Sequence, residues 1–134
     1  MYEDTYCGTA DEAVSFVTDV DRDNVGLNPD LGNLIRLHRP VEDWQSMHDK
    51  VLPHANFWHI KNYLRDEDPA TGSYFSFPAP LETGFINYRQ VIEQALRLGF
   101  QGPFVTEHYG NDWLGVGVRN LRYLREVLAL ALDE

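Results

Sequence analysis

The sequence is poor in cysteine and in positive charge. Cys7 is the only cysteine among the 134 residues, which excludes an intrachain disulfide framework and a zinc site built from several thiolates. The 11 basic residues stand against 21 acidic ones, so the formal net charge is -10. A chain with this charge repels a nucleic acid backbone. We therefore expect a reducing compartment and no DNA or RNA partner.

Long apolar runs are also missing. No stretch approaches the ~20 consecutive apolar residues that span a bilayer, and no basic segment followed by an apolar run stands at the N-terminus. Hydrophobic residues nevertheless make up 43% of the chain and aromatic residues 13%, which is typical of a packed core. We expect one cytoplasmic globular domain over residues 1–134 and no membrane partner.

Helical periodicity recurs along the chain. Residues 9–21 begin with Thr9 and Glu12 in the spacing of a capping box, followed by an apolar face. A second helix is predicted to begin at Pro40 and to stop at Pro53. Further helices are predicted within residues 86–98, with Gly99 as the terminator, and within 119–134.

Short apolar runs between these helices predict strands. They are "NVGLNPD" at 24–30, "ANFWHIK" at 55–61 and "GPFVTEHYG" at 102–110, with a further strand end at the N-terminal "MY". Residues 62–85 contain several prolines and glycines without a clear period, so a long functional loop is expected there. The order predicts an α/β fold of βα units with about four parallel strands.

Each predicted strand ends in a residue that can bind a metal or move a proton. These residues are Glu3, Asp30, His59 and Glu107. The carboxyl ends of parallel strands meet on one face, where three carboxylates and an imidazole would form a hard, oxygen-rich site for Mn, Mg, Co or Zn. Taken singly, each carboxylate could instead cap the next helix, and the histidine could be a hydrogen-bonded core residue. Their recurrence on successive units favours the metal site.

Four segments, "GLNPDLGN", "FWHIKN", "PLETGFINY" and "GPFVTEHYG", resemble the C-terminal half of the xylose-isomerase-like TIM-barrel superfamily of sugar phosphate isomerases and epimerases. The resemblance extends over nearly the whole chain. It implies a divalent metal ion held by Glu3, Asp30, His59 and Glu107. Several members carry a second histidine three residues after the metal aspartate, where this chain has Asn33, which cannot carry a proton at neutral pH.

The resemblance also implies a reaction. A proton next to a carbonyl of a sugar or sugar phosphate would be abstracted through an enediolate, with Glu3 and Glu107 exchanging the proton. Such a glutamate needs a pKa raised toward the working pH. Arg65, Lys61 and Asn33 are expected to orient substrate oxygens through hydrogen bonds. The DNA-repair endonuclease branch of the superfamily uses a larger zinc cluster, and the acidic charge and scarce matching histidines argue against it.

The expected size is that of half a TIM barrel, because a complete barrel has eight strands in about 250 residues. A half-barrel leaves two strand edges unpaired and an apolar face open to water. We therefore expect a homodimer or a partner that supplies the missing half. Alternatively, the chain is a fragment of a longer gene product. A catalytically incomplete half-barrel that acts as a small-molecule-binding or interaction module is the alternative function.

Overall fold

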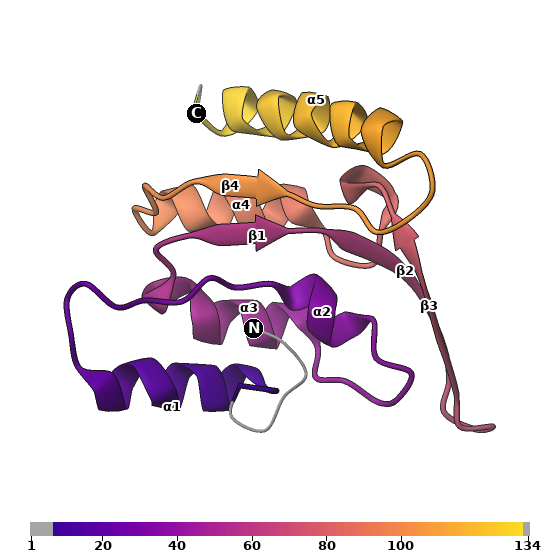
Figure 1. Ribbon diagram of the computed structural model, residues 1–134, viewed down its shortest axis with the longest axis horizontal. Coiled ribbons are helices and arrows are strands. Elements are labelled where there is room, and N and C mark those ends of the chain that lie inside the picture. The colour runs from indigo at the N-terminus through magenta and orange to yellow at the C-terminus, as the bar shows by residue number, and fades with distance from the viewer. Residues whose placement is uncertain (1–6, 133–134) are drawn as a thin grey trace.

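The computed structural model of the protein describes residues 7–132. Its parallel strands form a short central layer, with α1 beyond one edge and α5 beyond the other (Figure 1). The helices are α1 (Ala10–Val20), α2 (Leu31–Ile35), α3 (Trp44–Val51), α4 (Tyr88–Arg97) and α5 (Trp113–Leu132), with short 3-10 turns η1 (Leu52–His54) and η2 (Leu81–Thr83). None of these helices has the length and apolar character of a membrane span.

The central layer is parallel. Strand β1 (Trp58–Ile60) pairs in parallel with β4 (Phe104–Thr106), with His59 opposite Val105. On the other side of β1, Leu27 forms a parallel bridge with Ala55, and the His59 amide donates to the carbonyl of Pro29 at 3.2 Å. Three segments far apart in the sequence therefore run side by side in one direction. The predicted α/β architecture with parallel strands is confirmed.

Local signals set the ends of the helices. Thr9 and Glu12 form the predicted capping box of α1, and Gly99, with a φ of 83°, follows the end of α4 as expected. The predicted start at Pro40 is wrong. The Asp43 carboxylate accepts a hydrogen bond from the Ser46 amide at 3.1 Å, so α3 begins at Trp44.

The long loop predicted over residues 62–85 is wrong in its larger part. Strands β2 (Asn62–Asp68) and β3 (Ser73–Ala79) form an antiparallel hairpin. It projects beyond the rest of the molecule (Figure 1). Gly72, with a φ of 69°, lies in the turn, where a left-handed backbone is needed. Pro78 is tolerated inside β3 because, within residues 7–132, that strand pairs only with β2 and is an edge strand.

The core lies between the parallel layer and the helices that cover it. Trp58 is almost fully buried, and its ring contacts Phe100 edge to face at 5.7 Å between centroids. The His48 ring lies 5.3 Å from that of Trp58 and is also buried. Since Trp58 and Ile60 point into this core, the residue between them, His59, points to the opposite face of the layer.

Candidate metal centre

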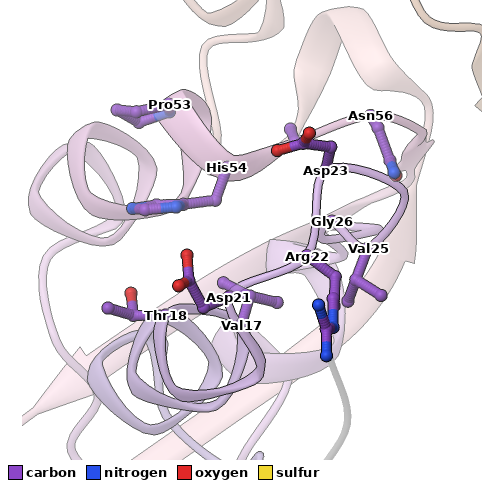
Figure 2. A pocket seen from close by; sticks show the side chains of 11 residues that line it. Val17, Thr18, Asp21, Arg22, Asp23, Val25, Gly26, Pro53, His54 and Asn56 are labelled. Atoms are coloured by element: carbon purple, nitrogen blue, oxygen red, sulfur yellow. The ribbon is translucent and has the colours of Figure 1, made fainter.

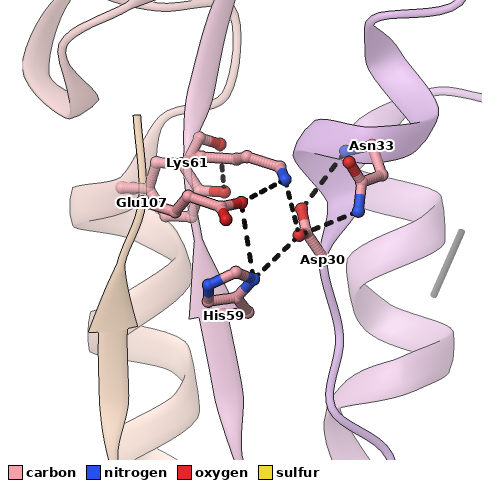
Figure 3. Close-up of polar contacts among 6 residues, drawn as sticks. Asp30, Asn33, His59, Lys61 and Glu107 are labelled. Atoms are coloured by element: carbon pink, nitrogen blue, oxygen red, sulfur yellow. Dashed lines mark hydrogen bonds and ion pairs between the residues drawn. The ribbon is translucent and has the colours of Figure 1, made fainter. Parts of the chain in front are cut away.

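Three of the predicted strand-end residues converge on one edge of the parallel layer (Figure 3). Asp30 follows the segment that bridges to Ala55, His59 lies in the middle of β1, and Glu107 comes directly after β4. The Glu107 amide donates to the Ile60 carbonyl at 3.0 Å, which continues the parallel pairing and brings its side chain beside β1. The topology of the sheet therefore joins residues separated by 29 and 48 positions in the sequence.

The candidate ligand atoms lie close enough together to hold one metal ion. His59 Nδ1 lies 3.0 Å from Asp30 Oδ2 and 3.8 Å from Glu107 Oε2. One ligand atom from each residue lies within 4.8 Å of the other two. Atoms that bind one ion at about 2.0–2.2 Å lie roughly 3 to 4 Å from one another. Two carboxylates and one imidazole thus fit a divalent ion of the Mg, Mn, Co or Zn type.

The Asp30 carboxylate is both the cap of α2 and a candidate metal ligand. Its carboxylate caps α2 by accepting from the Asn33 amide nitrogen at 3.2 Å, and it accepts from the Asn33 side-chain Nδ2 at 2.9 Å. These bonds fix the orientation of the carboxylate toward His59. The cap and the metal ligand were alternatives at the level of sequence, but one side chain provides the geometry of both. Asn33 therefore joins the site through Asp30.

Lys61 brings a positive charge into the cluster. Its side chain is 2% exposed, and Nζ lies 3.0 Å from Asp30 Oδ2 and 2.5 Å from Glu107 Oε2. The Tyr109 ring lies 4.4 Å from the same nitrogen, in the range of a cation–π contact. The predicted residues Asn33 and Lys61 are thus brought together with Asp30, His59 and Glu107.

The charges shift each other's pKa values. Burial raises the pKa of Glu107, but the hydrogen bond and charge of Lys61 outweigh it and bring that pKa below its ordinary value. This direction is opposite to the raised pKa expected for a catalytic glutamate. Burial lowers the pKa of Lys61, but Glu107 and Asp30 more than offset it, so that pKa is raised. The arrangement favours an ionised carboxylate beside a charged ammonium.

Arg65 lies away from this cluster. Its guanidinium is buried and donates to the carbonyls of Ile35, Leu37 and Arg39, each at 2.6 Å, and also pairs with Glu67. These bonds fasten the loop after α2 to the hairpin. Direct contact with a substrate would require some of these bonds to break. The remaining predicted ligand, Glu3, lies outside the described residues.

Tyr109 and Gly32 complete the surroundings of Lys61. The Tyr109 ring lies against the Lys61 ammonium. Of the other aromatic residues close to the strand ends, Trp58 is buried in the core, whereas Phe57 and Trp113 are exposed. Gly32 was missed: a Cβ there would lie 2.6 Å from Lys61 Cγ. The only sequence signal was a glycine inside the first turn of a helix.

A separate hollow opens at the other end of the strands (Figure 2). It has a volume of about 390 Å³ and lies between the end of α1 and the residues before β1, with Asp21 and His54 in its wall. In parallel α/β barrels this amino-terminal end of the strands serves stability, and chemistry occurs at the carboxyl end. The three candidate metal ligands therefore lie at the carboxyl end of the strands, where such folds place their active sites.

Comparisons with known proteins agree with this architecture. The family model described as "Xylose isomerase-like TIM barrel" matches residues 1–128. A magnesium complex of a xylose isomerase-like TIM barrel protein from Mycobacterium smegmatis is 63% identical, with a TM-score of 0.95 over 98% of this chain and 43% of that one. A xylose isomerase domain protein from Planctomyces limnophilus is 20% identical and shows the shared fold, with a TM-score of 0.74 over 100% and 45%.

None of the curated proteins matches the chain. The chain spans less than half the length of each of the two solved structures, in agreement with a partial barrel. The parallel strands, the helices that cover them and the family match over residues 1–128 lead to one conclusion. The chain belongs to the xylose isomerase-like TIM-barrel family, and its described part has the fold of half a barrel.

Proposed function

We propose that this chain carries the metal-binding half of a divalent-metal-dependent sugar or sugar phosphate isomerase or epimerase. The observation that carries the proposal is the convergence of Asp30, His59 and Glu107 at the carboxyl ends of three parallel segments. The magnesium bound by the relative from Mycobacterium smegmatis supports the choice of a hard divalent ion. Glu3 is proposed as the fourth ligand.

Different residues are proposed to carry out the separate proton transfers of such a reaction. A divalent ion, when bound, polarises a carbonyl and a neighbouring hydroxyl of the sugar. Glu107 is proposed to accept the proton from the carbon beside the carbonyl at Oε1. Lys61 holds its pKa below the ordinary value, so the carboxylate is ionised but is a weaker base than one whose pKa is raised toward the working pH. Glu3 is proposed to return a proton to the enediolate. The two glutamates would thus act as base and acid in turn.

Other side chains would hold the substrate. The Lys61 ammonium lies beside Glu107 and offers donors to sugar oxygens. Asn33 keeps the Asp30 carboxylate oriented and is proposed to contact a substrate hydroxyl as well. Arg65 would contribute from a distance, since it holds the loop after α2 in place through three carbonyls.

The open side of the half-barrel is proposed to meet another half-barrel, from a second copy or from another chain. Exposed apolar side chains of α5, Trp113, Leu114, Val118 and Leu121, line a hollow that also reaches Glu107. An apolar face of this kind marks an interaction surface. A partner seated there would form the wall of the site beside Glu107 and exclude water from it.

Asn33 favours a second candidate, a half-barrel that binds a small molecule without turnover. The amide stands where several members of the family carry a histidine, and its Nδ2 is engaged by Asp30. An amide cannot move a proton at neutral pH. Metal-dependent turnover on a panel of ketoses and their phosphates would exclude this candidate.

The metal site is tested by calorimetric titration of Mg²⁺ and Mn²⁺ into the wild-type chain and into His59→Ala and Glu107→Ala. We expect each substitution to weaken binding at least about tenfold, because each removes one ligand. Asp19→Asn, an exposed acidic residue of α1, is the matched control and keeps the wild-type affinity. Equal metal binding by all four proteins would reject the site.

Proton transfer is tested separately. Each sugar of the panel is incubated in deuterium oxide with metal-loaded protein, and deuterium at the carbon beside the carbonyl is measured by NMR. We expect incorporation that Glu107→Ala abolishes. Metal binding without any incorporation, including after a completing half-barrel is added, would favour the binding module over the isomerase.

A further inference from the structure

Lys61 places a positive charge at the oxygens that would ligate the metal (Figure 3). Asp30 Oδ2 lies 3.0 Å from His59 Nδ1 and 3.0 Å from Lys61 Nζ. Glu107 Oε2 lies 2.5 Å from the same ammonium. The ammonium therefore uses the two carboxylate oxygens that face His59. A divalent ion drawn to His59 and these oxygens would compete with Lys61 for the same lone pairs.

The stem of Lys61 is firmly held. Gly32 packs directly against Lys61 Cγ, with no room for a Cβ, and the Tyr88 hydroxyl donates to the Lys61 carbonyl at 2.7 Å. Both contacts fix the backbone and the first part of the side chain. Only the end of the side chain, which carries the ammonium, is left free to rotate.

Tyr109 provides a second place for that ammonium. Its ring lies 4.4 Å from Lys61 Nζ, and the residue is 62% exposed. An aromatic face attracts a cation and competes poorly with a carboxylate pair. A short rotation of the lysine end toward Tyr109 would release the carboxylates while the ammonium keeps a favourable contact.

We propose that Lys61 is the resident cation of the metal-free site, which holds Asp30 and Glu107 together until a divalent ion displaces its ammonium toward Tyr109. The inference rests on the proposed metal site and adds a mechanism for its loading. Without Lys61, two carboxylates would face each other with no counter-charge between them. With Lys61 still in place, an incoming divalent ion would meet a positive charge at close range.

The composition of the chain permits a direct test, because Lys50 and Lys61 are its only lysines. Lys50 also bridges two carboxylates, with Nζ 2.9 Å from Asp11 and 2.6 Å from Glu42, and lies in α3 away from the site. A protein labelled with 13C at the lysine ε-carbons gives two signals in NMR, assigned with Lys50→Met. During a Mg²⁺ titration we expect the Lys61 signal to shift along the calorimetric binding curve. The Lys50 signal stays in place.

Matched substitutions give the second arm. Methionine retains the apolar stem of lysine without its charge, so Lys61→Met preserves most of the packing against Gly32. We expect Mg²⁺ to bind Lys61→Met at least about tenfold more tightly than wild type, because a competing charge is removed. Lys50→Met keeps the wild-type affinity. The NMR arm uses the unsubstituted chain and holds even where Lys61→Met folds poorly.

The outcomes separate this inference from the proposed function. Mg²⁺ binding with an unmoved Lys61 signal, or with equal or weaker affinity in folded Lys61→Met, overturns the inference and leaves the metal site standing. Binding by Lys61→Met alone overturns the inference, because an ion that does not bind the wild type does not displace its ammonium. No binding by any of the proteins overturns both the metal site and the inference.

Discussion

Gly32 lies so close to Lys61 that a Cβ at position 32 would come within 2.6 Å of Lys61 Cγ and 2.7 Å of the Lys61 carbonyl oxygen. Gly32 is in the first turn of α2, and Lys61 joins β1 to β2. The two elements can approach this closely only where one residue has no side chain. The position of the Lys61 ammonium between Asp30 and Glu107 therefore depends on Gly32.

We expect Gly32→Ala to destabilise the protein by about 1–3 kcal/mol, because an added methyl group in a filled space forces backbone to move. Chemical denaturation measures this loss. Gly117→Ala in α5 is the matched control: nothing lies within 4 Å of its added Cβ, and the helix gains about 0.5–1 kcal/mol from alanine. Equal stability of both variants would contradict the close packing of Gly32 against Lys61.

Contacts between residues close in the sequence could be predicted more readily than contacts between distant elements. The capping box of Thr9 and Glu12 spans three residues, so it is visible in the sequence and confirmed in α1. Asp30, His59 and Glu107 are brought together by parallel topology, and the residue types at strand ends carry that information. The Gly32–Lys61 contact joins two elements across 29 positions, and no periodic pattern encodes it.

The hairpin shows why a pattern can mislead. Leu64 pairs with Phe77 across the two strands, and both are exposed, as is Phe75. Strand prediction relies on one buried face, so apolar residues that remain in water weaken the signal. Pro78 reads as a strand breaker, yet an edge strand accommodates it opposite Tyr63. Exposure and edge position are properties of the folded molecule that the local sequence does not contain.

His48 makes the stability depend on pH. Burial lowers the pKa of His48 from its ordinary 6.5 to about 4, and the nearby Asp49 opposes this only in part. The unfolded chain therefore binds a proton between about pH 6.5 and pH 4 that the folded chain does not bind. The contribution of His48 to stability is fully present above about pH 6.5 and is lost as the pH falls through this window.

Between pH 7 and pH 5 we expect His48 to account for a loss of about 2 kcal/mol in the free energy of unfolding. Urea denaturation at the two pH values measures it, with His48→Phe as the comparison, because phenylalanine fills the place beside Trp58 without binding a proton. His38→Phe, at an exposed position, leaves the proton uptake of His48 intact. A drop of the same size in His48→Phe would assign the pH dependence to other groups.

Arg65 links the hairpin to the loop after α2. Arg65→Met removes the donors to the carbonyls of Ile35, Leu37 and Arg39. We expect a loss of about 2–4 kcal/mol, because buried carbonyls lose a charged partner. Hydrogen exchange should rise in residues 36–39 and in the hairpin.

Arg89→Met is the comparison for this loss. Arg89 is exposed and pairs with Glu93 one turn along α4 at 2.7 Å. We expect its removal to cost less than about 0.5 kcal/mol. If Arg65→Met were equally mild and left hydrogen exchange unchanged, the carbonyl contacts would not be what holds the loop.

The exposed apolar side of α5 is expected to take part in assembly. Leu114, Val118 and Leu121 are exposed on a side of the helix next to the side that Leu124 and Val127 bury in the core. A carboxylate in an apolar interface is costly when it has no partner. We expect Leu121→Asp to weaken self-association, or association with a completing half-barrel, at least about tenfold, as measured by sedimentation velocity.

Leu98→Asp is the matched control, because Leu98 is likewise an exposed leucine but lies at the end of α4, outside this face. It should associate like the wild type. Since the hollow beside Leu121 extends to Glu107, a partner seated there would also cover this proposed metal ligand. Leu121→Asp should therefore weaken Mg²⁺ binding only at protein concentrations where the wild type is assembled. Loss of affinity at every concentration would mean that the substitution damages the chain itself.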